Sequence, residues 1–312
     1  MKAAVIADKD IDVVEVSDPV CGSEELLIEV TAAGLNAADL LQKNGYYPAP
    51  PGIPQDIPGL EFSGIVKQTG DQTTGFKVGD AVMGLVGGAA QAELCKIHYS
   101  NALHVPDSLD LVLAGGFCET YFTAYDALAG QAELRLSEKL LINGSAGGVG
   151  LSAIALGAAM NARVFASARH PEHHDTLRRL GAQPLLPSEA ENNGPYDVIL
   201  ELVGAPNLES DLQMLASGGR ISIIGVGAGA RSEIDLRVLM GKRGRIHGST
   251  LRARDTAAKA ELSKQMIRHV IPLVDAGHAP VTVAATFDLA QVKKAYEAFA
   301  APGKLGKIIL TF

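Results

Sequence analysis

The sequence predicts an α/β protein with two domains, a β-rich N-terminal domain and a second domain built on a doubly wound parallel sheet. The chain has 312 residues, more than the roughly 250 to 300 that one hydrophobic core usually serves. It is 47% hydrophobic and 20% charged and contains 34 glycines, which is typical of a compact protein with many tight turns. Near Leu111 the pattern changes from short strands between turn residues to strands that alternate with helices.

The N-terminal domain is predicted from short apolar runs up to about Pro106. Turn residues separate these runs, among them a proline cluster between Pro48 and Pro58 and the pair Gly79-Asp80. One helix is expected here, at Ala37–Lys43. The expected strands are Lys2–Ala7, Asp12–Val16, Glu25–Ala33, Gly64–Thr69, Ala81–Gly84 and Ala92–Ile97.

The second domain is predicted from alternating strands and helices that follow a helical stretch from Leu111 to Leu128. Such alternation implies parallel strands joined by helical crossovers. The expected strands are Leu140–Asn143, Arg163–Ala168, Asp197–Val203, Arg220–Val226 and Arg245–Ser249. The expected helices between them are Val149–Met160, Glu172–Leu180, Leu208–Leu215 and Leu236–Gly241. A sheet of five strands is therefore predicted.

The C-terminal segment is expected to return to the first domain, because its strands can complete a sheet that the N-terminus opens. It contains a predicted helix from Asp255 to Asp275, a strand at Val281–Phe287, a helix at Leu289–Phe299 and a strand at Lys307–Phe312. We therefore assign residues 1–120 and 256–312 to the β-rich domain and residues 121–255 to the parallel-sheet domain.

Charge and cysteine content narrow the classes of function. Twenty-seven Lys and Arg against 35 Asp and Glu leave a net charge of -8, which disfavours nucleic acid or anionic lipid as a partner. Cys21, Cys95 and Cys118 form no C-x-x-C pair, which favours a reducing compartment. The N-terminus lacks the apolar core of a signal peptide, and Leu140–Met160 holds too many polar residues and glycines to span a membrane. We expect a cytoplasmic protein.

The strongest local signal is an apolar strand that runs into a glycine turn and a small-residue helix, from Leu140 to Gly150. In a dinucleotide-binding turn, one glycine lets the backbone approach the pyrophosphate and another lets the helix pack on the strand. Gly147 and Gly150 fit these roles, whereas Ser145 stands where the first glycine of G-x-G-x-x-G usually lies. The expected cofactor ligands here are Ser145, Ala146, Gly147, Gly148 and Val149.

The next strand ends without the acidic residue that binds the ribose hydroxyl of NAD. Its tip reads Ser167-Ala168-Arg169-His170, and a guanidinium at this place suits the 2'-phosphate of NADP(H). Ser167 and Arg169 are therefore predicted cofactor ligands, with a solvated charge as the alternative for Arg169. NADP(H) is the predicted cofactor.

A series of motifs runs along nearly the whole chain: Ala33–Asp39, Gly45–Pro48, Pro58–Gly64, Val78–Asp80, Thr123–Tyr125, Ala146–Gly150 and Leu251–Asp255. In this order they resemble the medium-chain dehydrogenase/reductase superfamily and, within it, the zinc-independent NADPH:quinone oxidoreductases. The resemblance is closest to the subgroup related to the p53-inducible quinone reductase. It implies a GroES-like N-terminal domain, a Rossmann dinucleotide-binding domain, a cleft between them and a homodimer.

The resemblance also implies that this chain holds no catalytic metal. Zinc-containing relatives place a cysteine, a histidine and a further cysteine at the metal, and the matching positions here hold Asn36, Leu60 and Glu119. An amide and an aliphatic side chain do not replace a thiolate or an imidazole as zinc donors. Without the metal, alcohol dehydrogenation is also disfavoured, because removal of the alcohol proton needs a Lewis acid or a base.

Hydride transfer remains, since the cofactor performs it while the protein aligns an electron-poor acceptor. Negative charge then grows on the acceptor oxygen, so a hydrogen-bond donor placed there lowers the barrier. Tyr47 and Asn36 are the candidate catalytic donors. The alternatives are that Tyr47 only packs a Tyr-Pro loop and that Asn36 only caps a helix.

Other residues are expected to support the site or to line the cofactor. Asp39, Glu61 and Glu119 are assigned supporting roles without proton transfer. Asp39 is expected to orient Asn36 or a neighbouring backbone group, and Glu61 to meet a buried basic or backbone partner. Residues expected to line the nicotinamide by backbone contact are Gly225, Val226, Leu251 and Arg252.

The predicted function is NADPH-dependent reduction of a quinone. An enone, 2-alkenal or enoyl-thioester reductase is the first alternative, because hydride addition to a conjugated carbon uses the same geometry. An NADPH-binding protein of low turnover, with a sensor or structural role, is the second. No G-x-x-x-x-G-K-[ST], H-E-x-x-H or G-x-S-x-G motif points to other chemistry.

Overall fold

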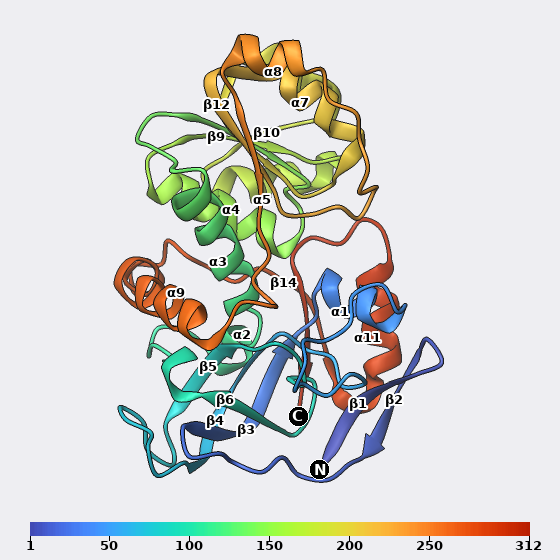
Figure 1. Ribbon diagram of the computed structural model, residues 1–312, viewed down its shortest axis with the longest axis vertical. Coiled ribbons are helices and arrows are strands. Elements are labelled where there is room, and N and C mark those ends of the chain that lie inside the picture. The colour runs from blue at the N-terminus through green and yellow to red at the C-terminus, as the bar shows by residue number, and fades with distance from the viewer. The chain divides into compact units, whose positions relative to one another are not determined.

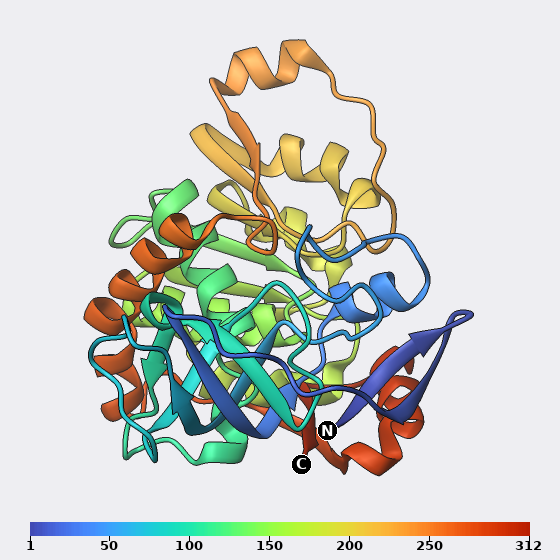
Figure 2. The ribbon, with the colours of Figure 1, turned by 60° about the horizontal axis from the view of Figure 1, so that its bottom comes forward.

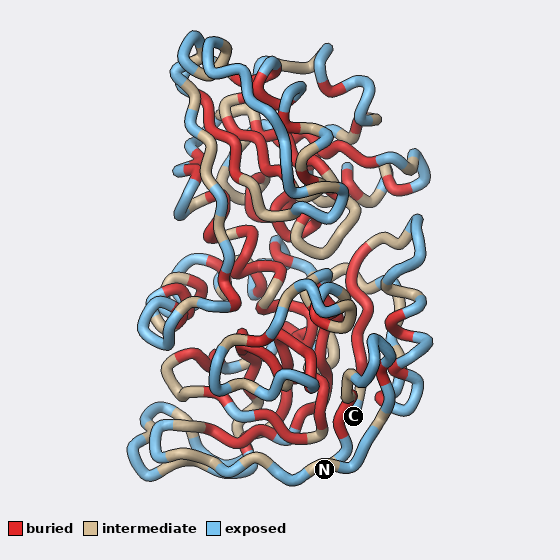
Figure 3. The backbone as a smooth tube through the Cα atoms, turned by 45° about the vertical axis from the view of Figure 1, so that its right-hand side comes forward, coloured by how far each residue is buried: buried red, intermediate tan, exposed pale blue.

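The computed structural model describes residues 1–312 and divides into two compact units (Figure 1). Unit 1 comprises Met1–Phe122, Leu251–Gly277 and Val281–Phe312. Unit 2 comprises Thr123–Thr250 and His278–Pro280. Each unit has its own sheet and its own buried core, seen as the buried stretches of backbone in Figure 3.

Unit 1 contains the strands β1 (Lys2–Ala7), β2 (Asp10–Glu15), β3 (Glu25–Gly34), β4 (Glu61–Thr69), β5 (Ala81–Leu85), β6 (Leu94–His98), β7 (Ala102–His104), β14 (Val283–Asp288) and β15 (Lys307–Thr311). Its main sheet has the order β14-β15-β3-β4-β5-β7, and β6 also pairs with β3. The C-terminal β15 lies antiparallel to β3, with Ile309 opposite Gly34. The prediction that the tail completes the first sheet is therefore confirmed.

The helices of this unit are α1 (Ala37–Lys43), α2 (Leu111–Ala114), α9 (Thr256–His269), α10 (Ile271–Asp275) and α11 (Val292–Ala300), and α3 (Cys118–Tyr125) begins in it. The single helix predicted from Asp255 to Asp275 is wrong, because Pro272 cannot continue the hydrogen-bond ladder and instead lies in the first turn of α10. The stretch from Leu111 to Leu128 is also divided: Gly115 caps α2, and a π-helical turn, Asp126–Gln131, follows α3.

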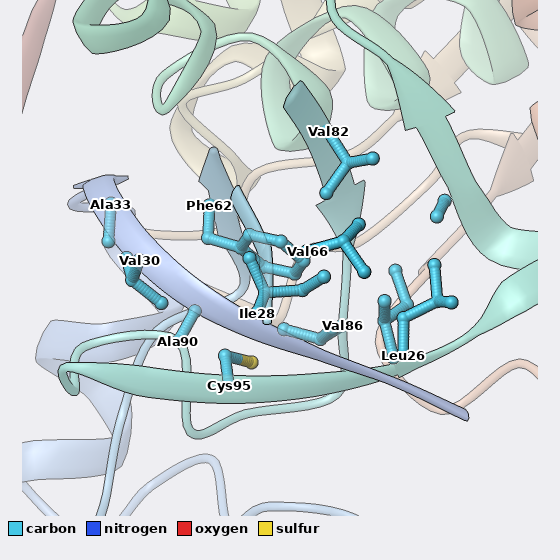
Figure 4. Close-up of a cluster of buried hydrophobic side chains, with 12 residues drawn as sticks. Leu26, Ile28, Val30, Ala33, Phe62, Val66, Val82, Val86, Ala90 and Cys95 are labelled. Atoms are coloured by element: carbon cyan, nitrogen blue, oxygen red, sulfur yellow. The ribbon is translucent and has the colours of Figure 1, made fainter. Parts of the chain in front are cut away.

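The core of unit 1 follows the two-residue period of its strands. Leu26, Ile28 and Val30 on β3 point to one face and pack with Phe62 of β4 and Val82 of β5 (Figure 4). A second cluster joins α11 to β15 and to the β1–β2 hairpin, which lie side by side in Figures 1 and 2. These clusters hold the ends of β3 and β15 in place, and both ends carry residues of the site described below.

Unit 2 is a parallel sheet with the order β10-β9-β8-β11-β12-β13. Its strands are β8 (Lys139–Asn143), β9 (Arg163–Ser167), β10 (Gln183–Leu185), β11 (Tyr196–Glu201), β12 (Leu215–Ile223) and β13 (Arg245–Gly248). The prediction of five strands missed β10, an edge strand of 3 residues that contains Pro184. The chain leaves β8 first toward β9 and later toward β11, so the switch point of the sheet lies between β8 and β11.

Helices connect the strands of unit 2 as crossovers. They are α4 (Gly148–Ala159), α5 (His174–Arg179), α6 (Ala190–Asn193), α7 (Leu208–Met214) and α8 (Leu236–Lys242). Short 3-10 turns occur across the two units at Tyr99–Asn101, Pro171–His173, Pro187–Glu189, Ala205–Asn207 and Leu289–Gln291. The longest helix of the chain, α9, has 14 residues, and no helix has the length and apolar character that a bilayer span requires.

Candidate active site

The glycine turn of unit 2 joins the carboxyl end of β8 to the start of α4. Gly144 has φ of +78°, a conformation that glycine adopts without steric cost, and Gly147 is the N-cap of α4. A Cβ atom built on Gly147 would have Gly144 O, at 3.9 Å, as its nearest neighbour. No protein atom therefore crowds the Gly147 Cα, and close approach of a ligand to the backbone at this position is what pyrophosphate binding at a helix N-terminus requires.

Gly150 has the other role that was predicted from the turn. A Cβ atom on Gly150 would lie 2.6 Å from Ser145 Cα and 2.6 Å from Ser145 O. Such distances are shorter than van der Waals contact, so only glycine lets α4 pack this closely on the turn. The predicted packing role of Gly150 is confirmed.

Ser145 is turned into the protein. It has no exposed surface, its Oγ donates to the carbonyl of Ser167 at 2.8 Å, and its backbone N–H donates to the same carbonyl at 3.2 Å. The Ser145 hydroxyl is thus not a cofactor ligand, which corrects that prediction. The serine instead ties the turn to the end of β9, and Ser167 supplies the acceptor.

Arg169 lies just beyond β9 and is exposed. Its guanidinium has no ion pair or hydrogen bond within the protein, whereas the neighbouring His170 has Glu172 at 3.3 Å. A free guanidinium at the tip of the strand that follows the glycine turn can bind a phosphate with paired hydrogen bonds.

A second loop at the switch point follows β12. A Cβ atom on Gly225 would lie 2.3 Å from Leu202 O, so the loop runs directly against the end of β11. Val226, the next residue, is 46% exposed. The loop after β12 thus reaches the same edge of the sheet as the glycine turn.

A buried polar group beneath these loops was not predicted from the sequence. Asn143 Nδ2 donates to Glu201 Oε2 and to Asp211 Oδ1, each at 2.8 Å. Glu201 Oε1 in turn accepts from the backbone N–H groups of Val203 and Gly204. Burial, and then the charge of Glu201, raise the pKa of Asp211 to about 8. Asn143 at the end of β8 therefore ties the end of β11 to Asp211 on α7.

In unit 1, a network of charged residues surrounds the N-terminus of α1. Asp39 Oδ2 accepts from the backbone N–H of Asn36 at 2.8 Å, and Asp39 Oδ1 accepts from Gly59 N–H at 3.0 Å. Gln91 Nε2 donates to Oδ2 as well, at 3.3 Å. The expectation that Asp39 orients Asn36 and neighbouring backbone is confirmed.

Glu61 and Lys307 form the buried centre of this network. Lys307 Nζ lies 2.6 Å from Glu61 Oε1, and the two side chains are 4% and 0% exposed. Lys307 also donates to Asn36 Oδ1 at 2.7 Å and to Leu35 O at 2.8 Å. The predicted basic partner of Glu61 is therefore present. Its identity was missed, and the only signal in the sequence was a lysine at the start of an apolar strand.

Asn36 is a bridge within this network. Its Nδ2 donates to Gly34 O at 3.2 Å and to Glu61 Oε1 at 3.0 Å, and its Oδ1 accepts from Lys307. Both amide hydrogens are thus directed at protein acceptors. This geometry corrects the expectation that Asn36 donates to a substrate oxygen.

Glu119 lies on the first turn of α3, and its backbone N–H donates to Glu61 Oε2 at 2.8 Å. Its own Oε2 is buried and has no hydrogen-bond partner. Burial, and then the charge of Glu61, raise the pKa of Glu119 to about 8, although Lys307 opposes the rise. Glu119 is therefore a neutral acid at neutral pH.

Arg252 holds the loop that carries Tyr47. Its Nε donates to Gly87 O and its Nη1 to Tyr47 O, each at 2.8 Å, and its Nη2 donates to Gln42 Oε1. The guanidinium also lies 5.0 Å from the centre of the Tyr47 ring. Leu251 and Arg252 are 5% and 4% exposed. The Arg252 side chain is therefore a positioning group in unit 1, and the backbone contact of Leu251 and Arg252 with the nicotinamide stays a prediction.

Tyr47 is half-buried, and its hydroxyl has no hydrogen-bond partner within the protein. Burial raises the pKa of Tyr47; the charge of Glu119 raises it further, and Arg252 opposes the rise. The Tyr47 ring is thus fixed by its neighbour while its hydroxyl stays available as a donor.

Two family models match the chain, one in its N-terminal part and one after it in the sequence. The one described as "Alcohol dehydrogenase GroES-like domain" matches residues 22–131, and the one described as "Zinc-binding dehydrogenase" matches residues 148–269. The chain belongs to the medium-chain dehydrogenase/reductase superfamily. Unit 1 contains its GroES-like domain and unit 2 its Rossmann-type parallel sheet.

Individual members of the superfamily resemble the chain over nearly all of its length. The quinone oxidoreductase of Lama guanicoe is 29% identical over 310 residues, which are 95% of this chain and 91% of that protein. An alcohol dehydrogenase superfamily protein from Novosphingobium aromaticivorans is 28% identical, with a TM-score of 0.89 over 100% of this chain and 99% of that chain. The mycobacterial Rv1454c, solved in complex with NADPH, shares the fold at 22% identity with a TM-score of 0.89 over 100% of both chains.

The side chains present in this chain determine whether it could bind a metal ion. Across residues 1–312, no three His, Cys, Asp or Glu side chains are grouped as a metal ion would require. At the positions discussed above, Asn36 is bonded to Lys307 and Glu61, and Leu60 is a buried aliphatic residue.

Proposed function

We propose that this protein is an NADPH-dependent quinone oxidoreductase that works without a bound metal. The observation that carries the proposal is the open glycine turn, in which Gly147 leaves the N-terminus of α4 free for a pyrophosphate. The name of the Lama guanicoe relative supports quinone as the acceptor. A bound nicotinamide cofactor supplies the hydride, and the chain's own residues bind it and orient the acceptor.

The cofactor is proposed to lie along the carboxyl edge of the sheet in unit 2. Backbone N–H groups of Ala146, Gly147, Gly148 and Val149 bind the pyrophosphate in this proposal. Arg169 binds the 2'-phosphate, which favours NADPH over NADH. The backbone at Gly225 and Val226 lines the nicotinamide.

On the acceptor side, Tyr47 is the proposed donor to the quinone oxygen that gains negative charge. Its free hydroxyl and its fixed ring support this role. Metal-free chemistry is supported by the donor set, because the Asn36 amide and the Leu60 side chain cannot replace a thiolate and an imidazole at zinc.

We also propose a homodimer joined through the edges of the parallel sheet. β13 is the edge strand of that sheet, and the neighbouring α8 leaves Leu236 and Met240 64% and 74% exposed. Light scattering is expected to give twice the chain mass of 32.5 kDa. A monomer at micromolar concentration contradicts this part of the proposal.

The test of the function is a panel of acceptors offered with NADPH. We expect fast NADPH oxidation with ortho- or para-quinones and slow oxidation with enones or enoyl-CoA. The reverse order of rates makes the protein an enone or enoyl-thioester reductase. Protection against heating by NADPH without turnover of any acceptor makes it a cofactor-binding protein with another role.

A further inference from the structure

The charged network of unit 1 leaves one carboxyl oxygen uncommitted. Both oxygens of Glu61 accept hydrogen bonds, from Lys307 and Asn36 on one side and from Glu119 N–H on the other. Both oxygens of Asp39 accept backbone N–H groups. Glu119 Oε2 is the exception, because it is buried and has no partner. A buried polar atom without a partner is costly and calls for a functional explanation.

The cationic groups around Glu119 donate to other acceptors, and none of them bonds to Glu119 Oε2. Lys307 gives its hydrogens to Glu61, Asn36 Oδ1 and Leu35 O. Arg252 gives its hydrogens to Gly87 O, Tyr47 O and Gln42. Lys259 Nζ donates to Arg252 O at 3.0 Å. Among the carboxylates of this network, Glu119 is the one with an oxygen that has no hydrogen-bond partner.

We propose that the carboxylic acid of Glu119 donates the proton that completes reduction of the acceptor, an inference that rests on the proposed quinone reductase function. A quinone that receives a hydride gains two electrons and one hydrogen nucleus and becomes the hydroquinone monoanion. The O–H bond of Glu119 then breaks, and its proton forms the second O–H bond of the hydroquinone. Glu119 remains as a carboxylate until a proton from solvent restores the acid.

The surroundings of Glu119 suit such a cycle. The acid form is stable at neutral pH because burial and the charge of Glu61 disfavour the carboxylate. The carboxylate that forms during turnover is stabilised by the charges of Lys307 and Arg252, which act against that rise. Asp39 adds a further negative charge, and the neighbouring Cys118 stays a thiol, because burial raises its pKa well above the usual value.

Tyr47 is the weaker acid of the two free groups, because burial raises the pKa of its phenol from an ordinary value that already lies far above neutrality. We therefore assign different roles to the two groups. Tyr47 holds the oxygen through a hydrogen bond, and Glu119 transfers the proton, since an acid with a pKa near the working pH is the more efficient donor.

The test compares Glu119→Gln with Glu261→Gln, the same chemical change on the exposed surface of α9. For the wild type we expect the kcat of quinone reduction to be constant near neutrality and to fall above about pH 8 as Glu119 ionises. Glu119→Gln should lower kcat at pH 7 by about 100-fold and lose this alkaline limb, with the affinity for NADPH unchanged. Glu261→Gln should behave as the wild type.

A second readout needs neither cofactor nor quinone. The infrared C=O band of a protonated carboxyl should disappear between pH 7 and 9 in the wild type, and the part assigned to Glu119 should be missing from Glu119→Gln. Asp211 contributes a band of the same kind, which the difference between the two proteins removes.

The outcomes separate the inference from the function on which it rests. A wild type that reduces no quinone overturns both. A wild type that reduces quinones, together with a Glu119→Gln variant that keeps its kcat and its alkaline limb, overturns the inference alone. An infrared band that titrates near pH 5 also overturns it, because the acid would then be ionised at neutral pH.

Discussion

The glycine turn of unit 2 and the charged network of unit 1 are specified by the sequence in different ways. The turn is continuous, from β8 through Gly147 to α4. The network is assembled from distant segments, with Lys307 and Asn36 271 residues apart in the chain. A local pattern is therefore sufficient to predict a backbone site for an anion. A buried side-chain network is defined only when strand pairing brings its members together.

The largest expected effect lies in the network, because it contains a buried ion pair. Lys307→Met removes the cation and leaves Glu61 buried without its partner, which should lower the free energy of unfolding by about 3–5 kcal/mol. Lys293→Met is the matched control, since Lys293 pairs with Asp10 and Asp12 on the surface. Denaturant titration should show a much smaller loss for this control, because exposed ion pairs contribute little to stability. Equal losses would mean that the network adds no particular stability.

The second effect distinguishes two glycines of the same turn. Gly147→Val adds a side chain where the protein leaves space, so the fold should remain while NADPH binding weakens by more than about 100-fold, or roughly 3 kcal/mol. Gly150→Val meets Ser145 backbone atoms and should destabilise unit 2 itself. Thermal melting and calorimetric titration measure the two effects. A folded Gly147→Val protein with the affinity of the wild type contradicts the assignment of the turn.

The third effect concerns the choice between cofactors. Arg169→Asp removes the guanidinium proposed to bind the 2'-phosphate and places a negative charge there. The loss of charge-assisted hydrogen bonds, about 1.5–3 kcal/mol, should shift the ratio of kcat/KM for NADPH over NADH by roughly 10- to 150-fold toward NADH. Arg179→Asp on the exposed face of α5 is the control. An unchanged ratio for Arg169→Asp assigns the 2'-phosphate to other residues.

The smallest effect is expected from Tyr47→Phe, which removes one hydroxyl and keeps the ring against Arg252. A single hydrogen bond that strengthens as charge grows should lower kcat by about 10-fold and leave KM nearly unchanged. Steady-state kinetics with one quinone measures both constants. A rise in KM at constant kcat would mean that Tyr47 only packs against the acceptor.

Local patterns predicted much of the fold because its elements have clear periods and turn residues. The helix Ala37–Lys43 and the strand Lys2–Ala7 are found with the bounds that were expected. The short strand β10 was missed because three residues that include a proline have no recognisable period. The apolar pattern from Asp255 to Asp275 predicts one unbroken helix, but Pro272 has no N–H to continue the hydrogen-bond ladder of α9.

The site was predicted less completely, for a physical reason. The space at Gly147 and the packing of Gly150 follow from backbone geometry, and the spacing of the glycines predicts that geometry. The roles of Asn36 and Arg252 depend on which hydrogen-bond partners the fold brings next to their side chains. Lys307 and Glu61 take the Asn36 amide, and backbone carbonyls of unit 1 take the Arg252 guanidinium. A sequence does not specify that competition between partners.

We propose that this chain binds a nicotinamide cofactor at the glycine turn and passes its hydride to a quinone. The most direct measurement is the rate of a single turnover, with protein-bound NADPH carrying either hydrogen or deuterium at C4 and mixed rapidly with a para-quinone. We expect loss of NADPH absorbance in step with hydroquinone formation, and a slower rate with deuterium. The account is contradicted if NADPH stays reduced in the presence of quinone, or if NADPH is oxidised at the same rate with hydrogen and with deuterium at C4.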